Sequence, residues 1–186
     1  MGVDEQAMRD EFERREKKRS EAYSEMIAVV GRVAQASARL ELQLRQLMQT
    51  LLDSKYARLV AAGLAAGELI DTCTVLLRVN KEISEDQRTE GLDLLAGLKE
   101  VLGVRNNLVH GLIAMSGSGL HDLEAPEPVV ETIALVSKRR KPELMVTVTV
   151  ADAEKTIEDL HKRADGILRW VATYLPGPLN REQVVS

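Results

Sequence analysis

The sequence predicts a mainly α protein: a bundle of four main helices and a charged N-terminal helix, with one inserted β-hairpin. Four long segments carry apolar residues at steps of three and four, the period of an amphipathic helix. Only 3% of the residues are aromatic, so Leu, Val, Ala and Met must fill the core, as is usual in helix bundles. A chain of 186 residues can bury such a core as one domain without metal or disulfide staples.

Residues 1–25 are predicted to form a charged N-terminal helix or arm. Acidic and basic residues alternate there, and pairs such as Glu11–Arg15 and Glu13–Lys17 stand four positions apart, where they stabilise an exposed helix. This charge run is the opposite of the apolar region of a signal peptide. We therefore expect either a solvated helix or an arm that packs against another subunit or partner.

The main helical domain is predicted over residues 26–175, and its first two helices are expected at about 26–52 and 56–80. The second is apolar on several sides and rich in small residues, which favours a central, buried helix. The first has the periodic apolar pattern of a long amphipathic helix. Its apolar positions are Val29, Val30, Val33, Ala36, Leu40, Leu44, Leu47, Met48 and Leu51.

The third main helix is predicted to begin after Ser84 and to run as far as His110. Ser84, with Gln87 three residues later, has the spacing of a capping box. Gly111 follows His110 directly and is suited to end or kink the helix.

A β-hairpin is predicted at about 129–150, because β-branched residues alternate with others there on both sides of the polar turn 137–142. The preceding stretch, 115–128, contains glycines and prolines and is expected to be a loop. Asp152 is predicted to cap the fourth main helix. Residues 176–186 then form a C-terminal tail.

Bulk properties limit the function classes. The net charge of −4 argues against nucleic-acid binding through overall charge, so any RNA contact would be local. The one cysteine, Cys73, cannot form an internal disulfide, which indicates a reducing compartment and a buried structural thiol. The most apolar stretch, 59–70, is too short to span a bilayer. We expect a soluble, cytoplasmic protein without a membrane partner.

Most catalytic motifs are absent from the sequence. It has no Gly-rich phosphate loop, no zincin or zinc-finger spacing and no Gly-x-Ser-x-Gly elbow, so neither a metal nor a cofactor is expected. What remains is the hexapeptide Arg105-Asn106-Asn107-Leu108-Val109-His110 at the end of the third helix. On a helix, Asn106 and His110 share a face, whereas Arg105 and His110 are about 140° apart around the axis. A site that uses both therefore needs an opened helix end or a second subunit.

The hexapeptide resembles the Arg-x4–6-His signature of HEPN-like ribonucleases, with four intervening residues and a polar residue, Asn106, directly after the arginine. The resemblance spans roughly residues 26–175, and it implies a helical bundle that acts as a homodimer. It also implies a metal-independent endoribonuclease of the toxin or defence type, a hydrolase that an antitoxin or another regulatory protein holds in check. The segment 38–44 resembles the first long helix of such proteins, in which an acid often points toward the site.

The reaction that fits these residues is attack of a ribose 2′-OH on the adjacent phosphorus. His110 would act as general base or acid, Arg105 would bind the phosphate, and Asn106 would orient it by hydrogen bonding. Glu41 would help by holding Arg105 or His110. The basic turn Lys138-Arg139-Arg140-Lys141 is a candidate RNA contact, although hairpin tips are commonly charged for solubility alone.

Two interpretations stay open at this point. In the first, the chain is an RNA-cleaving enzyme. In the second, it is a non-catalytic helical module that binds or regulates another protein, and His110 simply interacts with the C-terminal dipole of its helix. The sequence specifies neither the RNA target nor the identity of a partner.

Overall fold

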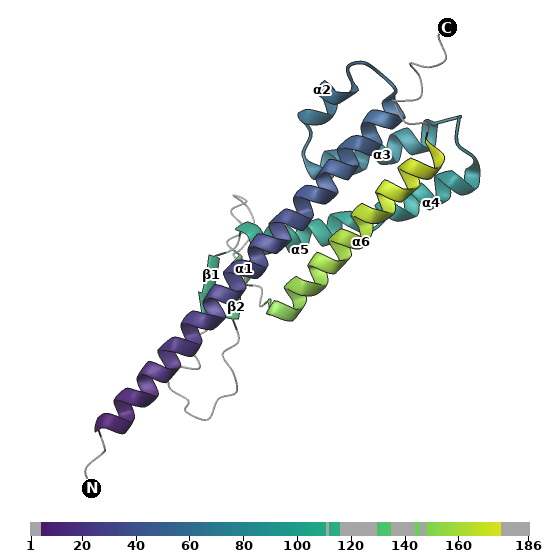
Figure 1. Ribbon diagram of the computed structural model, residues 1–186. Coiled ribbons are helices and arrows are strands. Elements are labelled where there is room, and N and C mark those ends of the chain that lie inside the picture. Colours follow the sequence, from purple (N-terminus) through teal and green to yellow (C-terminus); the bar gives the residue numbers. More distant parts are fainter. Residues whose placement is uncertain (1–4, 111, 116–129, 135–143, 146–147, 176–186) are drawn as a thin grey trace. The chain divides into compact units, whose positions relative to one another are not determined.

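The computed structural model describes residues 5–110, 112–115, 130–134, 144–145 and 148–175 (Figure 1). It confirms a mainly helical chain. The helices are α1 (Glu5–Leu52), α2 (Ala57–Ala62), α3 (Ala66–Val79), α4 (Glu85–Leu95), α5 (Leu98–His110) and α6 (Val150–Tyr174), and the strands are β1 (Leu112–Met115), β2 (Val130–Ala134) and β3 (Leu144–Met145).

The chain divides into two compact units. The first unit comprises Met1–Ala34 and Arg105–Lys155, and the second comprises Gln35–Val104 and Thr156–Ser186. Helices α1, α5 and α6 each contribute residues to both units.

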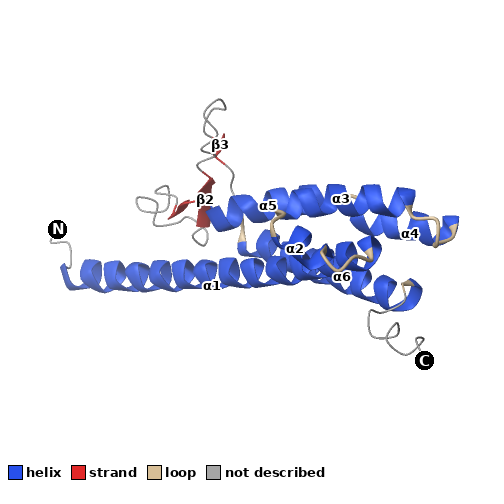
Figure 2. Cartoon of the chain, turned by 90° about the horizontal axis from the view of Figure 1, so that it is seen from above, coloured by secondary structure: helices blue, strands red, loops and turns tan. Residues whose placement is uncertain are grey.

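The charged N-terminal helix and the first main helix, expected as separate elements, are one continuous helix, α1 (Figure 2). The reason is local: residues 20–30 contain neither glycine nor proline, so nothing ends the helix where the charged segment gives way to the apolar one. The predicted end at Leu52 is confirmed. Asp53 follows with a φ of 45°, and its N–H donates to Gln49 O at 3.2 Å, which closes the last turn.

The second main helix, predicted as one element over 56–80, is two helices, α2 and α3. Gly63 ends α2, and Ala65 then takes an extended conformation before α3 begins. The Glu68 carboxylate accepts the Ala65 backbone N–H at 2.8 Å, which satisfies a donor at the start of α3. Gly63, which falls inside the helix predicted over 56–80, is therefore the residue at which α2 ends.

The third main helix is also divided, into α4 and α5. Its predicted start is confirmed, because the Ser84 hydroxyl accepts from the Gln87 N–H at 3.3 Å and the Gln87 side chain accepts from the Ser84 N–H at 2.8 Å. Gly97 has a φ of +72°, which favours glycine, and it separates the two helices. The predicted end at His110 is confirmed.

The second unit is a helical bundle whose members are joined by hydrogen bonds and ion pairs. Trp170 on α6 donates from Nε1 to Gln87 O at 3.1 Å, and Lys99 on α5 pairs with Asp71 on α3 at 2.6 Å. Arg88 on α4 donates to Leu77 O and Asn80 O at the end of α3. The buried apolar side chains include Ala36, Leu40, Leu44, Leu47, Met48, Leu69, Ile70, Cys73, Leu77, Leu95, Leu98, Leu102, Leu160, Ala164, Ile167 and Trp170.

The first unit contains the sheet. Its three strands pair antiparallel in the order β1-β2-β3, with Leu112 opposite Ile133 and Ile133 opposite Met145. This differs from the predicted two-stranded hairpin at 129–150: a third strand, β1, follows α5 directly, and β3 has only two residues. Val150, expected in a strand, begins α6 instead.

The start of α6 corrects the predicted cap. Thr149, not Asp152, precedes the first helical residue, and its hydroxyl lies 3.1 Å from the Asp152 N–H. Asp152 instead accepts the Thr149 N–H at 3.0 Å from inside the first turn. The two residues therefore form a capping box, in which each side chain satisfies a backbone donor of the other.

Candidate functional site

The hexapeptide occupies the last two turns of α5. Buried leucines hold this helix, with Leu98 at 0%, Leu102 at 6% and Leu108 at 1% exposure. Leu108 is the apolar anchor of the hexapeptide in the first unit. Because one side of the helix is buried, the polar residues of the hexapeptide lie toward its more exposed sides.

Arg105, Asn106 and His110 differ in burial. The Arg105 side chain is half-buried, whereas Asn106 and His110 are exposed. Arg105 Nη1 donates to Asn106 Oδ1 at 2.8 Å. The guanidinium therefore reaches round the helix to the amide that shares a face with His110.

This contact links Arg105 to a residue on the same helix face as His110. Helix α5 remains helical through His110, so an opened helix end does not bring the two together within the described residues. Gly111 lies outside those residues. The Arg105 guanidinium is instead bonded to Asn106, which stands four residues before His110 and so shares its helix face.

Glu41, the predicted helper, belongs to the second unit, and Arg105 and His110 belong to the first. The structure shows an ion pair between Glu41 and Arg45, one turn later on α1, with an N–O distance of 3.6 Å. Arg45 also donates to Leu64 O at 3.5 Å. A role of Glu41 toward Arg105 or His110 stays a prediction.

The predicted RNA-contacting turn, Lys138-Arg139-Arg140-Lys141, lies outside the described residues.

A second Arg–His pair is formed by side chains far apart in the sequence. Arg39 Nη1 on α1 lies 3.3 Å from His161 Nδ1 on α6, and Arg39 Nη2 donates to Asp165 Oδ1 at 2.6 Å. Sequence reasoning missed this cluster because its members are more than 120 positions apart. The carboxylate of Asp165 already pairs with the guanidinium, so the cluster fits a surface link between α1 and α6 better than an anion site.

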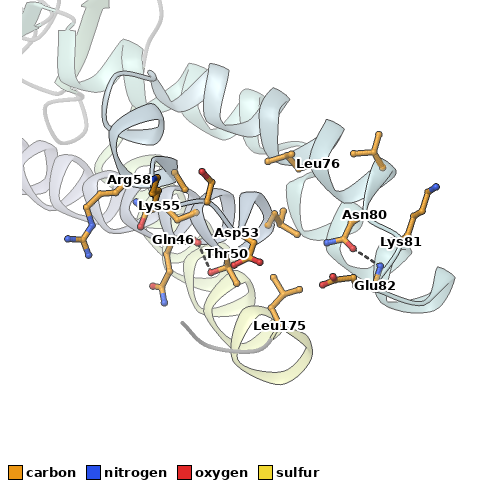
Figure 3. A pocket seen from close by; sticks show the side chains of 15 residues that line it. Gln46, Thr50, Asp53, Lys55, Arg58, Leu76, Asn80, Lys81, Glu82 and Leu175 are labelled. Atoms are coloured by element: carbon orange, nitrogen blue, oxygen red, sulfur yellow. Dashed lines mark hydrogen bonds between the residues drawn. The ribbon is translucent and has the colours of Figure 1, made fainter. Parts of the chain in front are cut away.

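An open groove of about 690 Å³ lies in the second unit, where the end of α1 meets α2, the end of α3 and Leu175 (Figure 3). Gln46 and Thr50 approach it from α1, and Lys55 and Arg58 from the turn and helix that follow. It contains no residue of the hexapeptide and no histidine. It offers polar contacts but no imidazole, the side chain whose ordinary pKa lies nearest neutral pH.

No cluster of three or more His, Cys, Asp or Glu side chains in the described part of the chain has the geometry to hold a metal ion. None of the helices in that part is both long and apolar enough to cross a membrane.

Comparisons of the chain with protein-family models, curated proteins and solved structures found no match. The HEPN-like resemblance therefore stays a prediction that depends on the hexapeptide and on the mainly helical fold.

Proposed function

We propose that the chain is a HEPN-like, metal-independent endoribonuclease whose site is the exposed face at the end of α5. The observation that carries the proposal is the Arg105–Asn106 hydrogen bond of 2.8 Å, which draws a cation toward the face that bears His110. A guanidinium, an amide and an imidazole are then available for one phosphate.

The reaction follows from these groups. A ribose 2′-oxygen attacks the adjacent phosphorus while a base removes its proton, and the 5′-oxygen leaves with a proton from an acid. The products are a 2′,3′-cyclic phosphate and a free 5′-hydroxyl. Imidazole titrates in the range that suits either proton transfer, and Arg105 stabilises the negative charge that develops on the phosphoryl oxygens.

One chain contributes one histidine at this site, but the reaction has two proton transfers. We infer that His110 from a second copy supplies the other role, so that one of the two imidazoles acts as base and the other as acid. The exposure of His110 in the last turn of α5 is compatible with such sharing.

The test uses the purified full chain, a 5′-labelled oligoribonucleotide and excess EDTA. We expect cleavage that leaves a 2′,3′-cyclic phosphate, and His110→Ala should slow it by roughly 10²- to 10⁴-fold, the usual contribution of a general acid or base. Arg105→Ala should also slow cleavage strongly. Because His110 is exposed, its replacement should not disturb the fold.

The second Arg–His pair provides matched controls. His161→Ala and Arg39→Ala remove the same residue types from another surface, so they should cleave RNA like the wild type. A substrate with a 2′-deoxyribose at the cleaved position should be resistant, because the attacking hydroxyl is missing. Equal activity of His110→Ala and wild type, or cleavage of the deoxy substrate, would refute the proposal.

The toxin or defence role has its own test. Expression of the wild-type chain should arrest growth, and His110→Ala and Arg105→Ala should be harmless at equal protein levels. Rescue by a protein encoded nearby would identify the antitoxin or regulator. Growth arrest by all three chains would exclude RNA cleavage at this site as its cause.

One observation favours the alternative, a non-catalytic interaction module. Large apolar side chains are exposed on α2 and on one face of α3, namely Leu59 at 77%, Val60 at 50%, Val75 at 56% and Val79 at 63%. Large exposed apolar side chains are more numerous at protein-binding surfaces than elsewhere on a soluble protein when they form one patch. Under this alternative, Leu59→Asp would abolish binding of a partner protein, and His110→Ala would change nothing.

A further inference from the structure

The burial pattern of α1 defines a seven-residue repeat. Met26, Val33, Leu40 and Leu47 stand seven positions apart, and their side chains are 0–2% exposed. Such a repeat marks one face of a helix that packs along its length, and these residues take the a positions of a heptad. Val29, three residues after Met26, is also buried and takes a d position.

Extended toward the N-terminus, the same register passes Arg19, which is exposed and pairs with Glu16 of the same helix, and it reaches residues that are largely exposed. Fourteen positions before Met26 stands Phe12, the only phenylalanine in the chain, which falls at an a position and is 63% exposed. Arg15, at the next d position, donates from Nε to Glu11 Oε1 at 2.8 Å. This bond directs the Arg15 side chain back along the helix, toward the turn that contains Glu11.

Charged residues flank this face of α1 on both sides, and their signs determine which helix could pack against it. By the same register, Glu11 and Lys18 take g positions, and Arg9 and Glu16 take e positions. In an antiparallel pair of identical helices, g residues lie opposite g residues and e residues opposite e residues. With Phe12 opposite Arg15 of the other copy, each acid at these positions then faces a base.

We propose that residues 5–25 of α1 form an antiparallel helix pair with the same segment of a second copy of this chain. Glu11 then pairs with Lys18 of the other copy, and Arg9 pairs with Glu16, each twice by two-fold symmetry. Phe12 packs under the guanidinium of Arg15 from the other copy, a cation–π contact. The inference does not depend on RNA cleavage.

A parallel pair is disfavoured by the same charges. Residues at g would then face e residues five positions later, which brings Glu11 against Glu16 of the other copy. The two Arg15 side chains would also meet at one d position. Like charges at these positions oppose pairing, so the sequence selects the antiparallel arrangement.

The experiment is sedimentation equilibrium of the full chain over a wide range of protein concentration, at low and high salt. We expect a monomer–dimer equilibrium that weakens as salt rises, because the flanking ion pairs are exposed to solvent. Glu11→Lys should weaken the dimer roughly tenfold, since it replaces two attractions between the copies by two repulsions and also removes the pairs of Glu11 with Arg14 and Arg15 in its own helix. Lys18→Glu should do the same, and Phe12→Ala should also weaken it.

The decisive variant combines Glu11→Lys with Lys18→Glu. In the antiparallel pair this double replacement restores opposite charges, so the affinity should return to near the wild-type value. Lys17→Glu is the matched control, because position 17 faces away from the pairing surface and should leave the affinity unchanged. Circular dichroism checks that each variant keeps its helix content.

A chain that is monomeric at every concentration would overturn the inference. So would a double variant as weak as either single variant, or a Lys17→Glu variant as weak as Glu11→Lys. If the dimer passes these tests but cleaves no RNA, the helix pair is supported and only the proposed ribonuclease function is contradicted.

Discussion

Gly91 and Trp170 provide a sharp test of the packing in the second unit. A Cβ added at Gly91, inside α4, would lie 3.0 Å from Trp170 Cζ2 and 3.3 Å from Leu77 Cδ1. The indole cannot easily retreat, because it is 3% exposed and its Nε1–H donates to Gln87 O at 3.1 Å. We predict that Gly91→Ala destabilises the protein.

The magnitude follows from two opposing effects. Replacing glycine by alanine inside a helix stabilises it by about 1 kcal/mol. Inserting a methyl group into a filled core costs about 1–3 kcal/mol, and a rigid ring held by a hydrogen bond favours the upper half of that range. The net expectation is a loss of about 1 kcal/mol, or a decrease in Tm of roughly 2–4 °C.

Gly103→Ala is the matched control. Gly103 also lies inside a helix, α5, but nothing stands within 4 Å of the Cβ that alanine would add. We expect it to stabilise the protein by about 0.5–1 kcal/mol. Urea unfolding can be followed by the fluorescence of Trp170, the one tryptophan in the chain. If Gly91→Ala stabilised the protein as much as Gly103→Ala, the packing of Trp170 against α4 would be wrong.

Three further predictions concern single sites. Burial raises the pKa of the Cys73 thiol to about 12, so the folded protein should resist thiol reagents at neutral pH and react only on unfolding; rapid reaction of the folded form would contradict a buried Cys73. Hydrogen bonds from the Thr149 backbone and hydroxyl hold the pKa of Asp152 below its ordinary value of 3.8. Because the folded pKa is the lower one, ionised Asp152 contributes stability that is complete above its ordinary pKa and is lost as pH falls through the folded pKa. Asp152→Asn should therefore flatten the acid side of the stability–pH curve, and an unchanged slope would count against these hydrogen bonds. Gly97→Ala should destabilise the protein by about 1 kcal/mol in urea unfolding, since a side chain at a φ of +72° is strained, and a gain in stability would show that the turn can change conformation.

The parts of the fold that depend on local signals could be predicted from the sequence. The end of α1 at Leu52, the Ser84–Gln87 capping box and the end of α5 at His110 are each specified by residues within one or two turns. The apolar faces of α1 and α6 were also predictable, because helical periodicity identifies the side that is buried.

The parts of the fold that the sequence did not predict depend on how neighbouring helices pack or on partners far along the chain. Gly63 and Gly97 both stand in helical patterns, and whether a glycine interrupts a helix depends on the packing of the helices on each side. Strand β1 was missed because its partner, β2, is separated from it by a long intervening segment. The cap of α6 was predicted at Asp152, three residues late, because Thr149 and Asp152 are both residue types that cap helices well.

The candidate site was predictable only as residue identities and helical positions. The sequence identified Arg105, Asn106 and His110 and placed them on the end of one helix. The hydrogen bond that turns Arg105 toward Asn106 depends on side-chain conformation and could not be predicted. The proximity of Arg39 to His161 likewise depends on how α1 packs against α6.

The most direct test of the central claim is a subunit-mixing measurement of RNA cleavage. Wild-type and His110→Ala chains are mixed in equal amounts, allowed to exchange subunits, and assayed in EDTA at constant total protein. If the site uses His110 from both copies, only dimers of two wild-type chains cleave, and the activity should fall to roughly a quarter of the wild-type value. A fall to only about half would show that each chain acts alone. No formation of a 2′,3′-cyclic phosphate by the wild type would contradict the proposed function itself.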